Sequence, residues 1–216
     1  MEIVHTPVLL RECLDFLSPV GEPYEKNAFM IDSTLGEGGH TNAFLSKYPE
    51  LKICGVDADS VIQQRAKERL SCFGDRIRFF NGWFNDFYSS YPAEMPKPDL
   101  ILFDLGISVF HYEKSNRGFS FRYDETLDMR LNENGTVSAF DIVNSYSEKD
   151  LADLIFLYGE EKLSRRIASA IVEARSVSEI SSSKSLAEII YNCVGAVPEM
   201  ENNRTETNSL DNKSGL

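Results

Sequence analysis

The part of this sequence that most constrains its fold is a glycine-rich turn at residues 31–40, I-D-S-T-L-G-E-G-G-H. An apolar run at 28–31 leads into Asp32, and three glycines follow: Gly36, Gly38 and Gly39. This pattern predicts a buried parallel strand, a tight turn and the start of a helix, an arrangement that brings backbone N–H groups close to a nucleotide-like ligand. Thr41 stands where the dinucleotide-binding fingerprint has its third glycine, so the turn alone is also compatible with an ordinary strand-to-helix connection.

Three further segments have the composition of buried strands, at 51–56, 77–80 and 98–106. Asp57 and Phe84 follow the first two, and Asp104 lies near the end of the third. Because the carboxyl ends of parallel strands meet at one edge, we expect these side chains and Asp32 to surround the glycine turn. Asp57 lies about twenty residues past the turn, where α/β nucleotide-binding folds place an acid on the ribose hydroxyls. Phe84 could stack on an adenine ring or belong to the core.

The acids at this edge indicate the kind of ligand. Three carboxylates suit a ligand with hydroxyl groups and a positive charge, whereas they would repel a pyrophosphate. S-adenosylmethionine, with its ribose, ammonium and sulfonium, fits this edge better than NAD does. The residues therefore predict an α/β fold with a parallel, Rossmann-like sheet and S-adenosylmethionine as cofactor.

The overall charge limits how the protein could bind other molecules. With 22 Lys and Arg against 34 Asp and Glu, the net charge of −12 argues against loose adhesion to nucleic acid or to anionic lipid. A nucleic-acid substrate would need a local basic cluster or presentation by a larger assembly. Four scattered cysteines without a C-x-x-C pair indicate free thiols, and no leader or membrane-length apolar run is evident. We therefore predict a cytoplasmic protein without a membrane partner.

The second half of the chain changes character. Residues 109–146 are polar and aromatic, which indicates a substrate or lid loop, and 147–196 have helical periodicity. The predicted domains are thus a cofactor-binding domain at 1–108, the loop at 109–146, a helical, RNA-binding or merely shielding subdomain at 147–196, and a disordered tail at 197–216. Three arginines of the loop could hold RNA phosphates or pair with neighbouring acids: Arg117, Arg122 and Arg130.

Eight motifs follow one another along the chain: H-T-P-V-L-L at 5–10, D-S-T-L-G-E-G-G-H at 32–40, G-V-D-A-D at 55–59, F-D-L-G-I-S at 103–108, R-G-F-S-F at 117–121, L-D-M-R at 127–130, Y-G-E-E at 158–161 and R-R-I-A at 165–168. In these motifs the chain resembles the bacterial methyltransferase family that modifies the exocyclic N4 of a cytidine in 16S ribosomal RNA. The resemblance implies a class I methyltransferase sheet, here with an incomplete C-terminal half, and an inserted helical subdomain. It also implies 16S ribosomal RNA or the small ribosomal subunit as partner.

The resemblance further implies contacts to S-adenosylmethionine from six residues: Gly38, Gly39, His40, Asp57, Phe84 and Asp104. Where the family follows D-L-G-V-S with Ser-Pro-Gln, this chain has Val109-Phe110-His111. His111 thus stands at the position of a glutamine that contacts the cofactor, and it can still donate or accept a hydrogen bond. Glu125-Thr126 likewise replaces the usual Gly-Pro before L-D-M-R.

Asp104 is also the catalytic candidate. The exocyclic nitrogen of cytosine is a weak nucleophile because its lone pair is delocalised into the ring, and an acceptor at its N–H would localise that lone pair and take the proton. Asp104 could do this, or it could only orient the cofactor while a backbone carbonyl or water accepts the proton.

The end of the chain departs from the family, whose members return from the helical region to the sheet. If this chain is complete, its fourth strand is an exposed edge, which a second copy or another protein could cover. A truncated, weakly active or inactive member that binds S-adenosylmethionine or RNA is therefore an alternative. An NAD-dependent oxidoreductase is a second, which Thr41 and the lack of an obvious catalytic pair disfavour.

Overall fold

The computed structural model describes residues 7–17 and 28–195. Two compact units make up this part of the chain. The first contains the described residues up to Ser120 together with Leu127–Ala139, and the second contains Phe121–Thr126 and the described residues from Phe140 onward. The disordered tail predicted at 197–216 lies outside the described residues, as do the first two residues of the motif at 5–10. The domain boundaries predicted at 108, 146 and 196 stay predictions.

The first unit is built on a parallel sheet of four strands: β1 (Phe29–Asp32), β2 (Lys52–Asp57), β3 (Ile77–Asn81) and β4 (Leu100–Leu102). Their order is β3-β2-β1-β4, and Ile31 lies opposite Cys54 on one side and Ile101 on the other. This is the strand order of the first half of a doubly wound α/β sheet. The predicted Rossmann-like fold class is confirmed.

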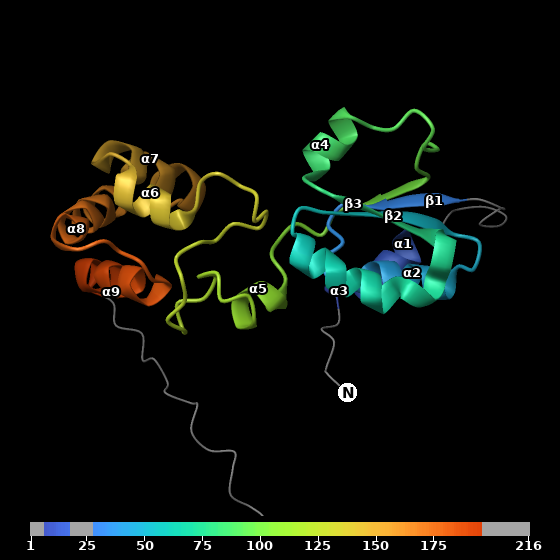
Figure 1. Ribbon diagram of the computed structural model, residues 1–216, viewed down its shortest axis with the longest axis horizontal. Helices are drawn as coiled ribbons and strands as arrows, with labels where there is room; N and C mark the ends of the chain where they lie inside the picture. The colour runs from blue at the N-terminus through green and yellow to red at the C-terminus, as the bar shows by residue number, and fades with distance from the viewer. Residues whose placement is uncertain (1–6, 18–27, 196–216) are drawn as a thin grey trace, which may run out of the picture. The chain divides into compact units, whose positions relative to one another are not determined.

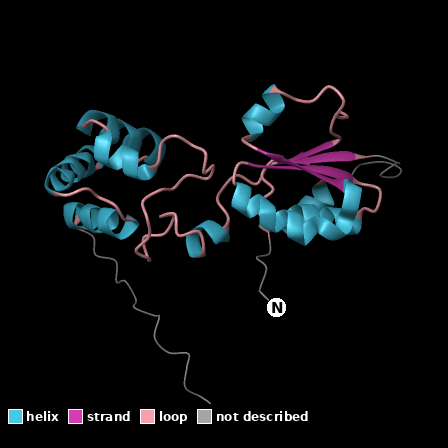
Figure 2. Ribbon diagram, viewed as in Figure 1, coloured by secondary structure: helices cyan, strands magenta, loops and turns pink. Residues whose placement is uncertain are grey.

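Helices cover both faces of this sheet (Figures 1 and 2). Met30 of β1 packs with Phe44 of α2 (Gly39–Lys47) and Leu70 of α3 (Ser60–Leu70) on one face. Ile31 packs with Phe87 of α4 (Phe84–Ser89) on the other face. Since successive strand residues point to opposite faces, β1 and β2 have to be apolar at nearly every position, which is why their sequences form continuous apolar runs.

The remaining helices of the first unit are short: α1 (Leu10–Phe16), the 3-10 helix η1 (Ser71–Arg76) and α5 (Val109–Glu113). The segment predicted as a loop from 109 onward therefore begins with a helix. Phe84, expected to follow a strand, opens the helix α4, which was not predicted. Asp59 caps α3, because its carboxylate accepts hydrogen bonds from the N–H groups of Val61 and Ile62.

Strand β4 is shorter than the predicted segment 98–106. Its three residues pair with β1, and within the described residues no strand pairs with its other side. Three apolar side chains within this strand or just after it are 43%, 44% and 73% exposed: Ile101, Phe103 and Leu105. A second copy or partner chain that covers this edge stays a prediction.

The second unit is helical, as predicted for residues 147–196, and its first helix lies within the segment predicted as a loop at 109–146. It contains α6 (Ala139–Ser145), α7 (Glu148–Gly159), α8 (Ser164–Val177) and α9 (Ser183–Val194). Ser147 caps α7 by accepting from the N–H of Asp150, and Ser182 caps α9 by accepting from the N–H of Ser185. Leu151, Ile167 and Ile171 are buried in this unit. Among the described residues, the structure has no helix with the length and apolar character needed to cross a membrane.

Candidate functional site

The glycine turn joins β1 to α2 and crosses the end of β2. Leu35 N–H donates to the Val56 carbonyl over 3.0 Å, and Gly36 N–H donates to Oδ2 of Asp57 over 2.7 Å. Gly36 and Gly38 have φ of +54° and +76°, the left-handed region that glycine enters without steric cost. Gly38 is also the N-cap of α2, where no side chain caps the helix. Backbone hydrogen bonds therefore hold the turn at the carboxyl edge of the sheet.

Gly38 is constrained by its neighbour as well as by its φ. A Cβ at this position would lie 2.8 Å from Cδ1 of Leu70. We expect Gly38→Ala to lower the free energy of unfolding by about 1–3 kcal/mol, because the left-handed conformation is strained for alanine and Leu70 has to shift. Urea denaturation measures this loss, with Gly159→Ala as control, since a Cβ there meets no atom within 4 Å. Equal stability of the two variants would contradict the constraint.

Asp32 does not reach the cavity that the sequence led us to expect for it. Its carboxylate is buried and accepts hydrogen bonds from Thr41 Oγ1 over 2.7 Å and from Thr34 N–H over 3.3 Å. Burial raises the pKa of Asp32, against the opposing effect of the Thr41 hydrogen bond. Thr41, which breaks the dinucleotide fingerprint, thus supports the acid beneath the turn. Thr34 in turn accepts the N–H of Asp104 through Oγ1 over 2.7 Å.

Asp57 faces the cavity at the end of β2. Its Oδ2 accepts the Gly36 N–H, and its Oδ1 accepts the Asp59 N–H over 2.8 Å. Burial raises the pKa of Asp57, while these two backbone hydrogen bonds lower it. A carboxylate offers about four acceptor positions, so two remain for a ligand.

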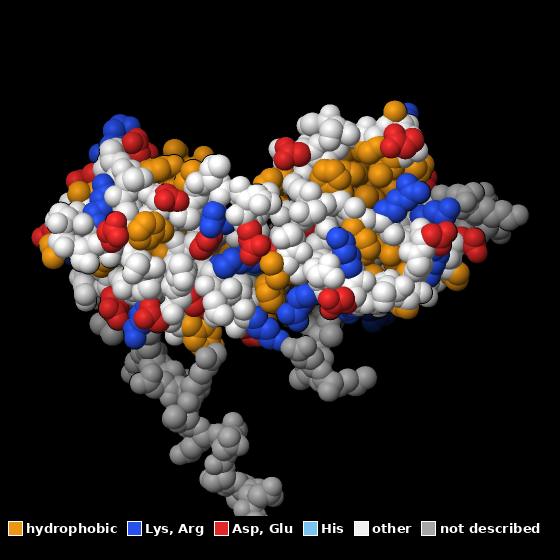
Figure 3. Space-filling view, in the orientation of Figure 1, with side chains coloured by type: hydrophobic (Ala, Val, Ile, Leu, Met, Phe, Trp, Pro, Cys, Tyr) orange, Lys and Arg blue, Asp and Glu red, His pale blue; other side chains and the backbone are white. Residues whose placement is uncertain are grey.

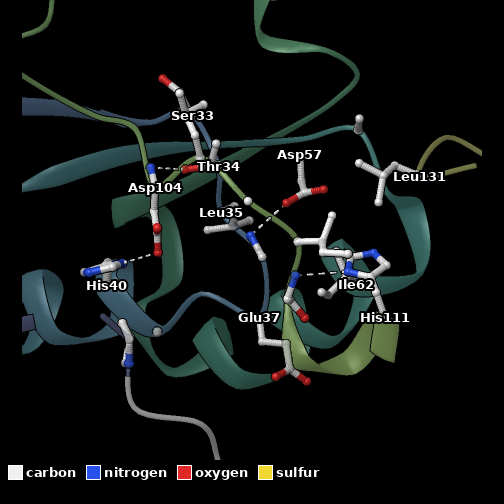
Figure 4. A pocket seen from close by; sticks show the side chains of 18 of the residues that line it. Ser33, Thr34, Leu35, Glu37, His40, Asp57, Ile62, Asp104, His111 and Leu131 are labelled. Atoms are coloured by element: carbon white, nitrogen blue, oxygen red, sulfur yellow. Dashed lines mark hydrogen bonds and ion pairs between the residues drawn. The ribbon is translucent and has the colours of Figure 1, made fainter. Parts of the chain in front are cut away.

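A cavity of about 470 Å³ opens beside these residues and lies within the first unit (Figure 4). The structure places six of the seven predicted site residues around it: Gly39, His40, Asp57, Phe84, Asp104 and His111. Gly38 lies next to them, at the N-cap of α2. Other residues that line the cavity were not predicted from the sequence, among them Ser33, Thr34, Glu37 and Leu131. Ser33 and Thr34 had a visible signal, because they directly follow the first strand.

Asp104 and His40 form a pair at one end of this cavity (Figure 4). His40 Nδ1 lies 3.8 Å from Oδ2 of Asp104, whose side chain is 47% exposed. The other ring nitrogen, Nε2, lies 3.1 Å from the Val8 carbonyl oxygen. Because a carbonyl can only accept, Nε2 carries a hydrogen and Nδ1 is the atom that faces Asp104. Phe84 also lines the cavity. Its ring packs edge-to-face against the ring of Phe103, the residue before Asp104, with 5.3 Å between the ring centroids.

A second carboxylate, Asp59, connects several segments behind the cavity. It is 1% exposed, caps α3, and accepts hydrogen bonds from Nε2 of His111 over 2.9 Å and from Nη2 of Arg117. Burial raises the pKa of Asp59, but the hydrogen bonds from His111 and Arg117 outweigh it and lower the pKa to about 2. Sequence analysis missed this residue, although its place two residues after Asp57 was visible in the motif at 55–59.

The lowered pKa of Asp59 makes a prediction about stability. A depressed pKa contributes stability above the unfolded value of 3.8, and this contribution is lost as the pH falls toward about 2. We expect Asp59→Asn to lower the free energy of unfolding by about 2 kcal/mol near pH 7. Denaturation at several pH values should show this difference unchanged down to about pH 5 and shrinking below. A difference that is the same at every pH would show that the charge of Asp59 is not responsible.

Two of the three arginines of the predicted loop, Arg117 and Arg130, pair with acids of the protein itself. Arg117 pairs with Asp59, and Arg130 forms a two-armed pair with Asp128 whose atoms lie 2.8 and 2.6 Å apart. Ion pairing, one of the two expected roles, therefore applies to both, although the partner of Arg117 is not one of its neighbours in sequence. On the face shown in Figure 3, basic and acidic side chains are interspersed.

All four cysteines are free, and Cys54 is buried whereas Cys72 is exposed. In the part of the chain that the structure describes, no group of three His, Cys, Asp or Glu side chains is placed to hold a metal ion.

The fold and this site define a Rossmann-like α/β protein with its cavity at the carboxyl edge of β1, β2 and β4, where ligands of such sheets bind. Comparison with known sequences gives the family. The chain belongs to the MraW methylase family, whose sequence model matches residues 2–209. The resemblance inferred from the motifs is thereby confirmed.

Curated relatives agree with this family. The chain is 61% identical over 194 residues to a ribosomal RNA small subunit methyltransferase H of Treponema denticola. The matched residues make up 90% of this chain and 60% of the relative. It is 45% identical over 207 residues to the protein of the same name from Borrelia hermsii, covering 95% of this chain and 68% of that relative. The chain therefore spans 60% and 68% of the length of these two relatives. A solved geranyl diphosphate methyltransferase in complex with GPP and sinefungin overlaps 33% of this chain with a TM-score of 0.29 and 23% identity, too little to support any inference.

Proposed function

We propose that this chain carries the S-adenosylmethionine site of a methyltransferase that acts on the exocyclic N4 of a cytidine in 16S ribosomal RNA. The observation that carries the proposal is the pair of carboxylates, Asp57 and Asp104, on either side of the glycine turn in one cavity. Family membership and the names of the relatives support the reaction class and the ribosomal RNA substrate. A cytoplasmic location stays a prediction.

The residues around the cavity fit this cofactor. About 470 Å³ is within the range of cavities that hold small molecules. Asp57 has backbone donors on both oxygens and keeps acceptor positions for two ribose hydroxyls. The negative charges of Asp57 and Asp104 attract the ammonium and sulfonium groups of S-adenosylmethionine and repel the pyrophosphate of NAD. When bound, S-adenosylmethionine supplies a methyl group that is electrophilic because of the attached sulfonium.

Asp104 is the residue we assign to the target base. Its carboxylate is half-exposed, and its backbone is held by Thr34, so its position is set by the turn itself. An acceptor there would bind the exocyclic N–H of cytosine, localise the nitrogen lone pair and take the proton that methylation releases. His40, whose Nε2 is held by the Val8 carbonyl, lies beside this carboxylate, with Nδ1 3.8 Å from Oδ2 of Asp104. The base has to be unpaired or flipped out to reach such a cavity.

Calorimetric titration of the 216-residue chain with S-adenosylmethionine, and with NAD as control, is the first test. We expect saturable binding of S-adenosylmethionine alone. Binding of NAD alone would favour an oxidoreductase, and a folded protein that binds neither would contradict the proposed site. Transfer of a labelled methyl group to small ribosomal subunits then separates an enzyme from a member that only binds the cofactor.

A further inference from the structure

His111 is the cavity residue whose role the geometry changes most. It is 4% exposed, and both of its ring nitrogens are engaged within the protein. Nδ1 lies 3.1 Å from the N–H of Ser108, and Nε2 lies 2.9 Å from Oδ2 of Asp59. Because a backbone N–H can only donate, Nδ1 accepts, and Nε2 carries the hydrogen that Asp59 accepts. No ring nitrogen of His111 is left to bind a ligand directly in this arrangement.

The two hydrogen bonds of His111 hold one wall of the cavity. Ser108 is the N-cap of α5, and with His111 it forms a reciprocal capping box: Ser108 Oγ accepts from the first turn while the His111 ring accepts the Ser108 N–H. The five residues just before and at the start of α5 all line the cavity: Leu105, Gly106, Ile107, Ser108 and Val109. The His111 ring therefore fixes the backbone of this wall at Ser108, where the wall enters α5.

The hydrogen bonds of His111 also lead to Asp57, the acid that faces the cavity. Asp59, which accepts from His111, donates its own N–H to Oδ1 of Asp57 over 2.8 Å. The path from the wall at 105–109 to Asp57 thus consists of three hydrogen bonds through two residues, His111 and Asp59. Asp59 also accepts hydrogen bonds at the N-terminus of α3, so its side chain cannot move without losing this helix cap.

Arg117 adds a third segment. Its Nη2 donates to Asp59, and its Nη1 donates to the carbonyls of Arg130 over 2.9 Å and of Leu131 over 3.3 Å. Leu131 lines the cavity as well. Phe119 packs against both partners of Asp59, with its ring 5.1 Å from the His111 ring and 5.9 Å from the Arg117 guanidinium. The carboxylate of Asp59 is therefore linked to two separate parts of the cavity wall, residues 105–109 through His111 and Leu131 through Arg117.

We propose that His111 is a positioning residue, which sets the 105–109 wall against Asp57 through Asp59, and is not a direct cofactor contact. The proposal rests on the proposed function for the identity of the ligand. It departs from the role that the resemblance implies at this position, where the family has a glutamine. A glutamine side chain has one acceptor and one donor group, so it could replace both bonds of the histidine, and alanine could replace neither.

The test compares His111→Ala, His111→Gln and the control Tyr112→Ala, which alters an exposed neighbour on the same helix. Amide hydrogen exchange of the protein without any ligand is measured first. We expect His111→Ala to increase exchange at 105–109 about tenfold or more, since the Ser108 N–H loses its acceptor, and His111→Gln and Tyr112→Ala to leave it near the native rate. Unchanged exchange in His111→Ala would overturn the proposal, because a residue that only contacts the cofactor has no effect in its absence.

Titration with S-adenosylmethionine is the second measurement. We expect His111→Ala to weaken binding about tenfold, and to weaken it less when Asp59→Asn is already present, because the two residues act through one hydrogen bond. Fully additive losses in the double variant would identify His111 as an independent contact and overturn the proposal. If the native chain binds no S-adenosylmethionine, the proposed function fails, and the exchange experiment alone still decides whether His111 holds the wall.

Discussion

Asp104→Asn is expected to slow methyl transfer to small ribosomal subunits by about 10²–10⁴-fold, the usual contribution of a positioned general base. Asparagine keeps the size of the side chain and can still accept a hydrogen bond, but it cannot take up the proton that leaves the cytosine amino group. Because Thr34 holds the backbone N–H of Asp104, the substitution should leave the turn in place. Single-turnover transfer of a labelled methyl group measures the chemical step.

The control for this prediction is Asp75→Asn, which removes one charge from an exposed position in η1. It accounts for any general effect of net charge on the approach of the negatively charged RNA. Calorimetry of both variants shows whether cofactor affinity is retained. Near-normal turnover in Asp104→Asn, with unchanged affinity, would exclude the base role and leave Asp104 only to orient the cofactor.

Asp57→Ala is expected to weaken S-adenosylmethionine binding by about 100-fold or more. Hydrogen bonds to a charged acceptor contribute about 1.5–3 kcal/mol each, and the proposed contact to two ribose hydroxyls would lose both. The substitution also leaves the N–H of Gly36 without its carboxylate partner, so the turn itself loses a support. Calorimetric titration gives the change in Kd directly.

Two comparisons make this second prediction specific. Asp57→Asn keeps the volume of the side chain, so a similar loss of affinity in that variant would exclude a collapsed cavity as the cause. Asp75→Ala serves as the control for an exposed carboxylate. Affinity within about threefold of the native value in Asp57→Ala would place the ribose elsewhere and remove the main support for the proposed site.

Much of the first unit could be predicted from local patterns. Apolar runs closed by Asp32 and Asp57, with a glycine turn between them, specify two buried parallel strands and the edge where their acids lie. The reason is that a strand covered on both faces has no polar positions, so its ends are visible in the sequence. Six of the seven predicted site residues do line one cavity, although their roles as ligands stay proposals.

The local patterns failed where a side chain's partner is distant in sequence. Asp32 and Asp57 both end a strand, yet the first is buried under Thr41 and the second faces the cavity. Phe84 was expected only to follow a strand, and it begins the helix α4, which was not predicted. Strand β4 was expected over 98–106 and has three residues, since only these pair with β1. Each outcome depends on which neighbouring element arrives beside the residue, and the residue's own neighbours in sequence do not specify that.

The sequence by itself determined the class of sheet, the glycine turn, the helical second unit and the acids at the strand ends, because these follow from periodicity, backbone freedom and strand polarity within short segments. Only the tertiary structure decided that Asp59 lies at the centre of a network with His111 and Arg117, which are 52 and 58 residues away along the chain. A buried carboxylate needs donors from whatever segments enclose it, and those segments meet only when the chain folds.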